Sequence, residues 1–197
     1  MVVLKPLQEK YGLKRVVYST YQAVSGSGVK GVTELEEGLK GNVLTKAYPH
    51  PIHNNCLPQV DVFLENGYTK EEMKMVLETR KILKDENLRV TATAVRVPIF
   101  NCHSESVNVE LEKPFDLAEL VQLLEESPGL VVMNNLSKLE YPLASIADDT
   151  DPVYVGRIRR DESVDNGVNL WIVADNIRKG AATNTIQIAE VLIAGQQ

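Results

Sequence analysis

Apolar residues recur at two different spacings along this chain, and the two spacings predict a mixture of strands and helices. Runs rich in β-branched and other apolar residues predict strands at 15–21, 60–64, 89–98, 103–112, 130–133, 153–160 and 168–174. Apolar residues three and four positions apart predict helices at 2–11, 32–39, 69–85, 116–126 and 177–192. Hairpin-like pairs alternate with crossovers, which favours an α+β fold with a mixed, largely antiparallel sheet covered by helices.

Polar residues at the ends of these segments support their limits. Thr69 followed by Glu72, and Asp116 followed by Glu119, have capping-box spacing, so each pair predicts the first turn of a helix. The Asn-Gly pair at 166–167 predicts a hairpin turn before the last strand. Because the sequence contains no Pro/Gly/Ser-rich linker and no internal repeat, one compact domain is expected, with the final helix as an exception.

Composition and charge exclude several classes of protein. The chain has 197 residues, of which 44% are hydrophobic and 24% charged, and this is enough apolar material for a core. The net charge of −6 argues against a large interface for nucleic acid. No apolar run approaches the ~20 residues of a membrane span, and the start of the chain does not read as a secretory signal. Two cysteines exclude a disulfide framework, so a cytoplasmic location is expected.

A glycine-rich segment at 26–31 has the spacing G-x-G-x-x-G and lies between a predicted strand and a predicted helix. That pattern is typical of a dinucleotide-binding loop. However, the acidic residue expected about 20 positions later is missing from the region 46–50, and no second βαβ unit follows. A turn that touches a phosphate or a nicotinamide through bare backbone amides is therefore favoured over a self-sufficient dinucleotide site.

The cysteines and two of the histidines give weak signals. His50, His53 and Cys56 lie at regular spacing in a proline-containing segment, but a metal site needs three or four ligands with fixed partners. An ordinary surface loop is favoured, and no metal is predicted. Cys102 directly precedes His103, and neighbours on a strand point to opposite faces. Cys102 is therefore predicted to be a small buried apolar residue rather than a nucleophile.

Arg96 and His103 flank the link between two predicted strands. An arginine in the otherwise apolar segment 90–97 needs a carboxylate or phosphate partner if it is buried. That partner is either a ligand or an internal carboxylate, with Glu105 and Glu110 as candidates, and spacing alone does not decide between them. The ordinary pKa of a histidine suits His103 to proton transfer near neutral pH.

Glu71 and Lys74 are three positions apart in the first turn of the helix predicted at 69–85, so they share a face of that helix. Taken alone, such a pair is typical of a solvated surface ion pair. A functional role for these two residues needs a further signal.

Six segments together resemble the C-terminal part of bacterial aspartate-semialdehyde dehydrogenase. They read STYQAVSGSG, NNCLPQVDVF, YTKEEMKM, VRVPIFNCHSESV, VGRIRRD and DNIRKGAATNTIQIAE. The similarity covers 4–192, and the combination is far more specific than any one motif. It implies a catalytic and dimerisation domain of the glyceraldehyde-3-phosphate dehydrogenase type at 1–175. It also implies that a final helix at 176–197 packs on an N-terminal Rossmann domain for NADP.

The resemblance also implies an activity. Enzymes of this family reduce aspartyl-β-phosphate to aspartate-β-semialdehyde with NADPH and release phosphate, a step toward lysine, threonine, methionine and diaminopimelate. A cysteine attacks the acyl phosphate to form a thioester, which hydride from NADPH then reduces. A homodimer is implied, with the substrate and phosphate as small-molecule partners.

By the same resemblance, five residues receive roles toward the substrate. His103 is the expected general acid/base, and Gln22 is expected to orient the thioester intermediate. Arg96 is expected to bind the substrate α-carboxylate through two parallel hydrogen bonds. Glu71 is the expected partner of the substrate amino group, and Lys74 is the expected partner of the phosphate.

Ser25, Gly26 and Asn176 are expected to contact the cofactor, with Asn176 near the nicotinamide. The nucleophilic cysteine of the family stands in an Asn-Cys-Ser/Thr motif, which neither Cys56 nor Cys102 matches. The resemblance thus predicts that the opening helix is truncated just past the nucleophile, and that this chain alone has no turnover and no tight hold on NADP. A non-catalytic dimeric module of the same fold is the alternative, and an autonomous dinucleotide-binding protein is least favoured.

Overall fold

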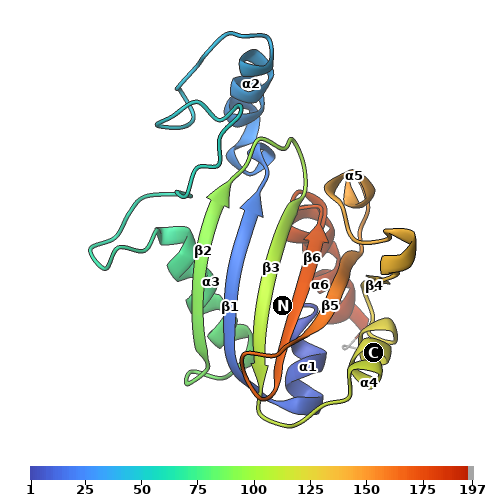
Figure 1. Ribbon diagram of the computed structural model, residues 1–197. Helices are drawn as coiled ribbons and strands as arrows, with labels where there is room; N and C mark the ends of the chain where they lie inside the picture. The colour runs from blue at the N-terminus through green and yellow to red at the C-terminus, as the bar shows by residue number, and fades with distance from the viewer. Residues whose placement is uncertain (195–197) are drawn as a thin grey trace.

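A computed structural model describes residues 1–194 and shows one six-stranded sheet in the order β2-β1-β3-β6-β5-β4 (Figure 1). The strands are β1 (Leu13–Gln22), β2 (Arg89–Arg96), β3 (His103–Leu111), β4 (Leu130–Met133), β5 (Val153–Asp161) and β6 (Gly167–Ala174). The pairs β1/β2 and β4/β5 are parallel, and the other three pairs are antiparallel. The predicted α+β fold with a mixed sheet is confirmed.

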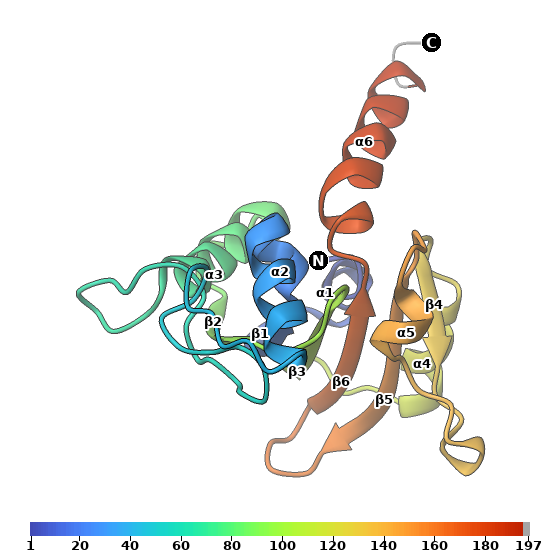
Figure 2. The ribbon, with the colours of Figure 1, turned by 90° about the horizontal axis from the view of Figure 1, so that it is seen from above.

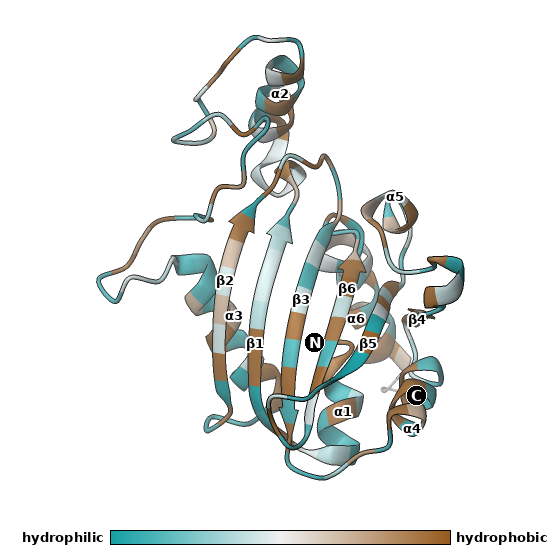
Figure 3. Ribbon diagram, in the orientation of Figure 1, coloured by the Kyte–Doolittle hydropathy of each residue, from teal (hydrophilic) through white to brown (hydrophobic). Residues whose placement is uncertain are grey.

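Helices cover one face of this sheet. Both α1 (Leu4–Tyr11) and α3 (Lys70–Leu83) lie on the same side of the strands (Figure 2), and α4 (Leu117–Glu125) packs against α1. Along β3, hydrophobic and hydrophilic residues alternate (Figure 3), so every second side chain faces the helices. The main core combines these strand residues with the apolar sides of the helices and includes Leu4, Leu7, Val16, Val107, Val109, Leu120, Leu124 and Leu170.

The predicted capping box at Thr69 forms in full, whereas of the box predicted at Asp116 only the hydrogen bonds to the Asp116 side chain form. The Thr69 side chain accepts a hydrogen bond from the Glu72 amide, and Glu72 accepts one from the Thr69 amide at 2.7 Å. The second carboxylate oxygen of Glu72 accepts a hydrogen bond from the Ala94 amide at 2.9 Å, which ties the start of α3 to β2. Asp116 caps α4 by accepting hydrogen bonds from the amides of residues 118 and 119.

A smaller unit, here called the α2 lobe (residues 24–58), lies beyond the ends of β1 and β2 (Figure 1). It contains the 3₁₀ turn η1 (Val24–Ser27), the helix α2 (Gly28–Leu39) and the loop that follows. Its own core consists of Val24, Leu35, Tyr48, Ile52 and Leu57. The helix predicted at 32–39 is confirmed, although it begins four residues earlier.

Two local predictions are wrong. Residues 60–64 form no strand: Asp61 adopts φ +69°, and Phe63 makes only an isolated bridge to Thr69. Val60 is buried, but Val62, Phe63 and Leu64 are exposed, and the segment has no neighbouring strand to hold it extended. The Asn-Gly pair is not a two-residue hairpin turn, because Gly167 already pairs with Asp161 across a loop at 162–166. The short elements η2 (Leu136–Lys138) and α5 (Ala144–Ala147) were not predicted from the sequence.

The last helix, α6 (Thr183–Ala194), follows a π-helical turn, η3 (Arg178–Ala182), and extends away from the sheet (Figure 2). Arg178 anchors its base through ion pairs to Asp149 and Asp151, each at 2.8 Å. Several large apolar residues of α6 are exposed, namely Ile186, Ile188, Val191, Leu192 and Ile193. None of the helices in residues 1–194 has the length and apolar character that a membrane crossing requires.

Candidate active site

Three predicted site residues meet at one edge of the sheet. β1 and β2 run parallel and end at Gln22 and Arg96, and the antiparallel β3 begins at His103. In the strand register, Gln22 pairs with Arg96 on one side and with His103 on the other. The topology therefore places an amide, a guanidinium and an imidazole side by side, although the residues lie up to 81 positions apart in sequence.

A cavity of about 490 Å³ opens at this edge. Its lining includes all of the predicted site residues except Ser25, which instead forms hydrogen bonds with Asn176 at 3.2 and 3.3 Å. The residues that line the cavity are Gln22, Gly26, Val60, Asp61, Glu71, Lys74, Arg96, His103, Asn176 and Gly180. The structure thus brings together side chains from β1, α3, β2, β3 and the segment before α6.

His103 has a defined tautomer. Its Nδ1 accepts a hydrogen bond from the Ala23 amide at 3.2 Å, so Nδ1 is unprotonated and the ring proton lies on Nε2. Burial and the neighbouring charge of Arg96 lower the pKa of His103 from 6.5 to about 4. At neutral pH, His103 is therefore a neutral imidazole with an N–H donor at Nε2.

Arg96 is 5% exposed, and its Nη1 donates a hydrogen bond to the Ala23 carbonyl at 2.6 Å. Burial lowers the pKa of the guanidinium, while Tyr48 and Glu71 act in the opposite direction. None of the ion pairs in the described part of the chain includes Arg96, and Glu110 pairs with Lys14 instead. The interpretation of Arg96 as one half of an internal salt bridge is therefore wrong, and among its guanidinium nitrogens only Nη1 has a protein hydrogen-bond partner in residues 1–194.

Glu71 and Lys74 lie on the first turn of α3 and face the cavity together. Their charged groups are 3.4 Å apart, and the side chains are 24% and 55% exposed. An exposed pair of this kind contributes little to folding stability. The cavity therefore has a cation and an anion at its mouth, beside the buried guanidinium.

Gly26 faces the two central residues of the site. A Cβ added at Gly26 would lie 2.8 Å from Nη1 of Arg96 and 3.2 Å from Nε2 of His103. A side chain at this position would therefore push into the guanidinium and the imidazole. In the same segment, Gly31 lies inside α2, where a Cβ would meet the Tyr48 hydroxyl at 2.5 Å.

Sequence comparison decides which family this site belongs to. The family described as "Semialdehyde dehydrogenase, dimerisation domain" matches residues 4–179. The aspartate-semialdehyde dehydrogenase of Aquifex aeolicus is 51% identical over 199 residues, which is 98% of this chain and 58% of the relative. The chain belongs to the family of semialdehyde dehydrogenase dimerisation domains. A relative from Legionella pneumophila is also 51% identical, over 98% of this chain and 57% of its own length.

Solved structures agree with this family assignment. Aspartate semialdehyde dehydrogenase II from Vibrio cholerae is 45% identical, has a TM-score of 0.93, and matches 98% of this chain and 58% of its own. The same enzyme complexed with ASA gives a TM-score of 0.92 at 44% identity, with the same coverage. This chain therefore spans about 58% of the length of the relatives that it matches.

In this semialdehyde dehydrogenase dimerisation domain, Cys102 is 1% exposed and packs with Ala147 and Val173, as predicted for a small buried residue. Burial raises the pKa of its thiol to about 12, so the reactive thiolate is disfavoured. Cys102 lies close to Asp148 and Asp175, but Asp175 is occupied by the amides of residues 149, 177 and 178. Cys56 is exposed, and the segment from His50 to Cys56 is a loop.

Sequence reasoning missed two parts of the site. Val60, Asp61 and Gly180 line the cavity; they lie in two of the six segments that carry the family resemblance, but sequence reasoning gave them no role. Ala23 binds both central residues through its backbone, with its N–H on His103 and its C=O on Arg96. A contact made by the backbone leaves no signal in the identity of the side chain.

Proposed function

We propose that this chain is the catalytic and dimerisation part of an NADP-dependent aspartate-semialdehyde dehydrogenase. The reaction reduces aspartyl-β-phosphate to aspartate-β-semialdehyde and releases phosphate, in amino-acid biosynthesis. The observation behind the proposal is the convergence of Arg96, His103, Glu71 and Lys74 on one cavity. The related Vibrio cholerae structure with ASA supports the substrate class.

In this proposal the charged residues recognise a small amino acid. The free N–H groups of Arg96 bind the α-carboxylate, because a planar guanidinium can present two parallel donors. Glu71 receives the α-ammonium group, and Lys74 places a point charge near the phosphate. Gln22, which is 6% exposed at the end of β1, orients the reacting carbonyl.

His103 acts as the general acid/base at the reacting oxygen. In the observed tautomer, Nε2–H is the donor, and it can stabilise negative charge that develops on that oxygen. To accept a proton at Nε2, the ring must first move its own proton to Nδ1, which breaks the hydrogen bond from Ala23. His103 therefore keeps the hydrogen bond from the Ala23 amide when it donates from Nε2, and loses that bond when it accepts a proton at Nε2.

The proposed cofactor side of the cavity is lined by Gly26 and Asn176, and Ser25 forms a hydrogen bond with Asn176 without lining the cavity itself. The amide side chain of Asn176 can form hydrogen bonds with a polar cofactor ring near His103. NADPH supplies the hydride when it is bound. A structure of the Candida albicans enzyme with NADP shares this fold at 24% identity and a TM-score of 0.72.

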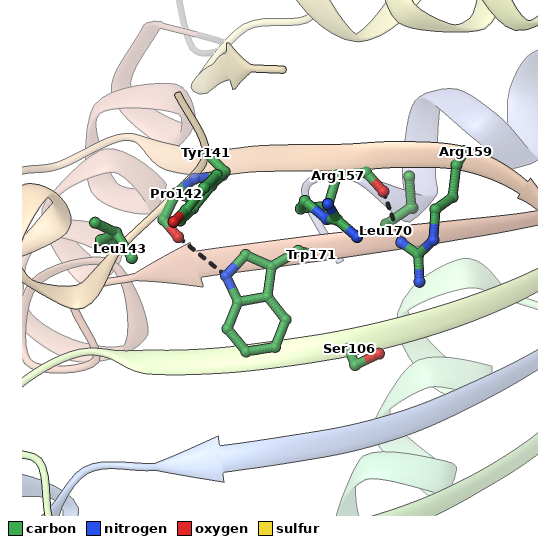
Figure 4. A pocket seen from close by; sticks show the side chains of 8 residues that line it. All are labelled: Ser106, Tyr141, Pro142, Leu143, Arg157, Arg159, Leu170 and Trp171. Carbon is green, nitrogen blue, oxygen red and sulfur yellow. Dashed lines mark hydrogen bonds between the residues drawn. The ribbon is translucent and has the colours of Figure 1, made fainter. Parts of the chain in front are cut away.

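The uncovered sheet face is the proposed dimer interface. Trp171 of β6 and Ser106 of β3 lie on this face beside a cavity of about 450 Å³, and Trp171 Nε1 donates a hydrogen bond to the Pro142 carbonyl (Figure 4). The rings of Tyr21 and Trp171 are 5.6 Å apart and extend the aromatic surface. α6 is proposed to pack on the NADP-binding domain of the complete enzyme through its exposed apolar residues.

The test is a fusion that joins this chain to the part of the Aquifex aeolicus relative that it does not cover, referred to below as the fused enzyme. We expect the fused enzyme to reduce NADP in the presence of aspartate semialdehyde and phosphate, and the 197-residue chain alone to show no turnover. His103→Ala in the fused enzyme should lower kcat by about 10²–10⁴-fold. A folded, NADP-binding but inactive fusion would instead support the non-catalytic dimeric module.

A further inference from the structure

Two polar groups are buried between the α2 lobe and the sheet without a protein partner. Nε of Arg96 and the hydroxyl of Tyr48 make no hydrogen bond within the described part of the chain. The two residues are 5% and 8% exposed. Unsatisfied polar groups at such depth are rare in native proteins because each one costs desolvation free energy. Oε1 of Glu34, on α2, is a third such atom in the same lobe, and a bound partner for any of these groups would remove that cost.

Both residues contact the turn that leads out of β1. Nη1 of Arg96 donates to the Ala23 carbonyl and lies against Gly26. On the other side, the Tyr48 hydroxyl and the Val24 carbonyl lie 2.5 and 2.7 Å from the point where a Cβ of Gly31 would stand. The guanidinium and the phenol thus approach the same short turn from two directions.

The backbone also links the two residues. The Arg96 amide and carbonyl exchange hydrogen bonds with Leu57 at 2.8 and 2.9 Å, and Leu57 packs with Tyr48 in the core of the α2 lobe. The turn and Leu57 thus provide two structural links between Tyr48 and Arg96.

We propose that Tyr48 is a positioning residue for Arg96, and that one bound water joins its hydroxyl to Nε of Arg96. A water accepts from Nε–H and exchanges a second hydrogen bond with the phenol, which satisfies both buried groups. The water at Nε and the Ala23 carbonyl at Nη1 then fix the plane of the guanidinium, and its other N–H groups point into the cavity. This proposal rests on the proposed function in one respect: the ligand that those N–H groups bind is taken to be the substrate carboxylate.

The test is the side-chain Nε–H signal of Arg96 in ¹H–¹⁵N spectra of this chain, identified by its loss in Arg96→Lys. We expect a protected signal with a cross-peak to a long-lived water, and Tyr48→Phe should remove that cross-peak and speed Hε exchange about tenfold. Tyr68→Phe is the matched control, because it removes a hydroxyl bonded to Thr91 Oγ1 at 2.9 Å. Arg80, whose Nε donates to Leu88 O, is the internal reference.

Two results would overturn the proposal. One is an Nε–H signal of Arg96 in the unmodified chain that exchanges as fast as the signal of the exposed Arg89. This measurement does not depend on whether a Tyr48 variant folds. The other is an Arg96 signal that Tyr48→Phe and Tyr68→Phe leave equally unchanged. Because no ligand enters the measurement, a failure of the proposed dehydrogenase function would leave this readout intact.

Discussion

The Ala23 amide donates a hydrogen bond to Nδ1 of His103, 3.2 Å away, across the start of the active-site turn. The same peptide segment accepts a hydrogen bond from Arg96 at its carbonyl. One alanine backbone therefore holds the imidazole and the guanidinium in a fixed relation. It also allows His103 to become charged only by protonation at Nδ1, which breaks the Ala23 contact.

This contact predicts a pH dependence of stability. The folded state depresses the pKa of His103 from 6.5 to about 4, so between these values the unfolded state binds more protons. The stability that His103 contributes is fully present above pH 6.5 and is lost as the pH falls toward 4, by about 3 kcal/mol at most. Urea unfolding of the chain and of His103→Asn, which keeps an acceptor for Ala23, should differ in slope over this range. Parallel curves would contradict the assignment.

Arg96→Lys should separate binding from stability. Lysine keeps the charge but loses the planar pair of donors, so the KM of the fused enzyme for aspartate semialdehyde should rise by about 10–100-fold. Arg89→Lys is the control, because Arg89 lies at the exposed far end of the same strand. Steady-state kinetics measure both variants, and equal KM values would exclude Arg96 from substrate binding.

Gly26→Ala should disturb both central residues at once. Its Cβ would lie 2.8 Å from Arg96 Nη1 and 3.2 Å from His103 Nε2, so one of them must move. We expect a loss of about 1–3 kcal/mol in the free energy of unfolding, measured with urea. Gly180→Ala is the stability control, since a Cβ there meets nothing within 4 Å. An unchanged stability of Gly26→Ala would show that the turn can relax away from the site.

Lys74→Met should change function without changing stability. Its ion pair with Glu71 is at the surface, so the free energy of unfolding should stay within about 0.5 kcal/mol of the unmodified value. The KM of the fused enzyme for phosphate should nevertheless rise about tenfold or more if Lys74 supplies the charge near phosphate. An unchanged KM for phosphate would show that Glu71 and Lys74 form only an ordinary surface ion pair.

The uncovered sheet face predicts the oligomeric state. Sedimentation equilibrium of this chain should give a dimer, and Ser106→Arg, which adds a bulky charge in the middle of that face, should give a monomer. Val29→Arg in the α2 lobe is the control, because Val29 is 82% exposed on α2 and lies outside the sheet. A dimer that survives Ser106→Arg would place the interface elsewhere.

The local structure of this protein follows from its sequence to a large degree. Helix starts at Thr69 and Asp116 depend on side-chain caps within three residues, and strand β3 depends on an alternation within nine. Such signals are local, so they can be identified before the fold is known. The segment 60–64 shows the limit: its apolar pattern favours a strand, but a strand also needs a neighbour, and none is available there.

By itself, the sequence determined the order of most helices and strands, the family, and a set of candidate site residues. Tertiary structure decided how they act together. The parallel pairing of β1 with β2 and the antiparallel pairing with β3 put Gln22, Arg96 and His103 at one edge. The tautomer of His103 and the anchoring of Arg96 come from the Ala23 backbone. Every residue has the same amide and carbonyl, so only the folded chain shows which of them lie within hydrogen-bonding distance.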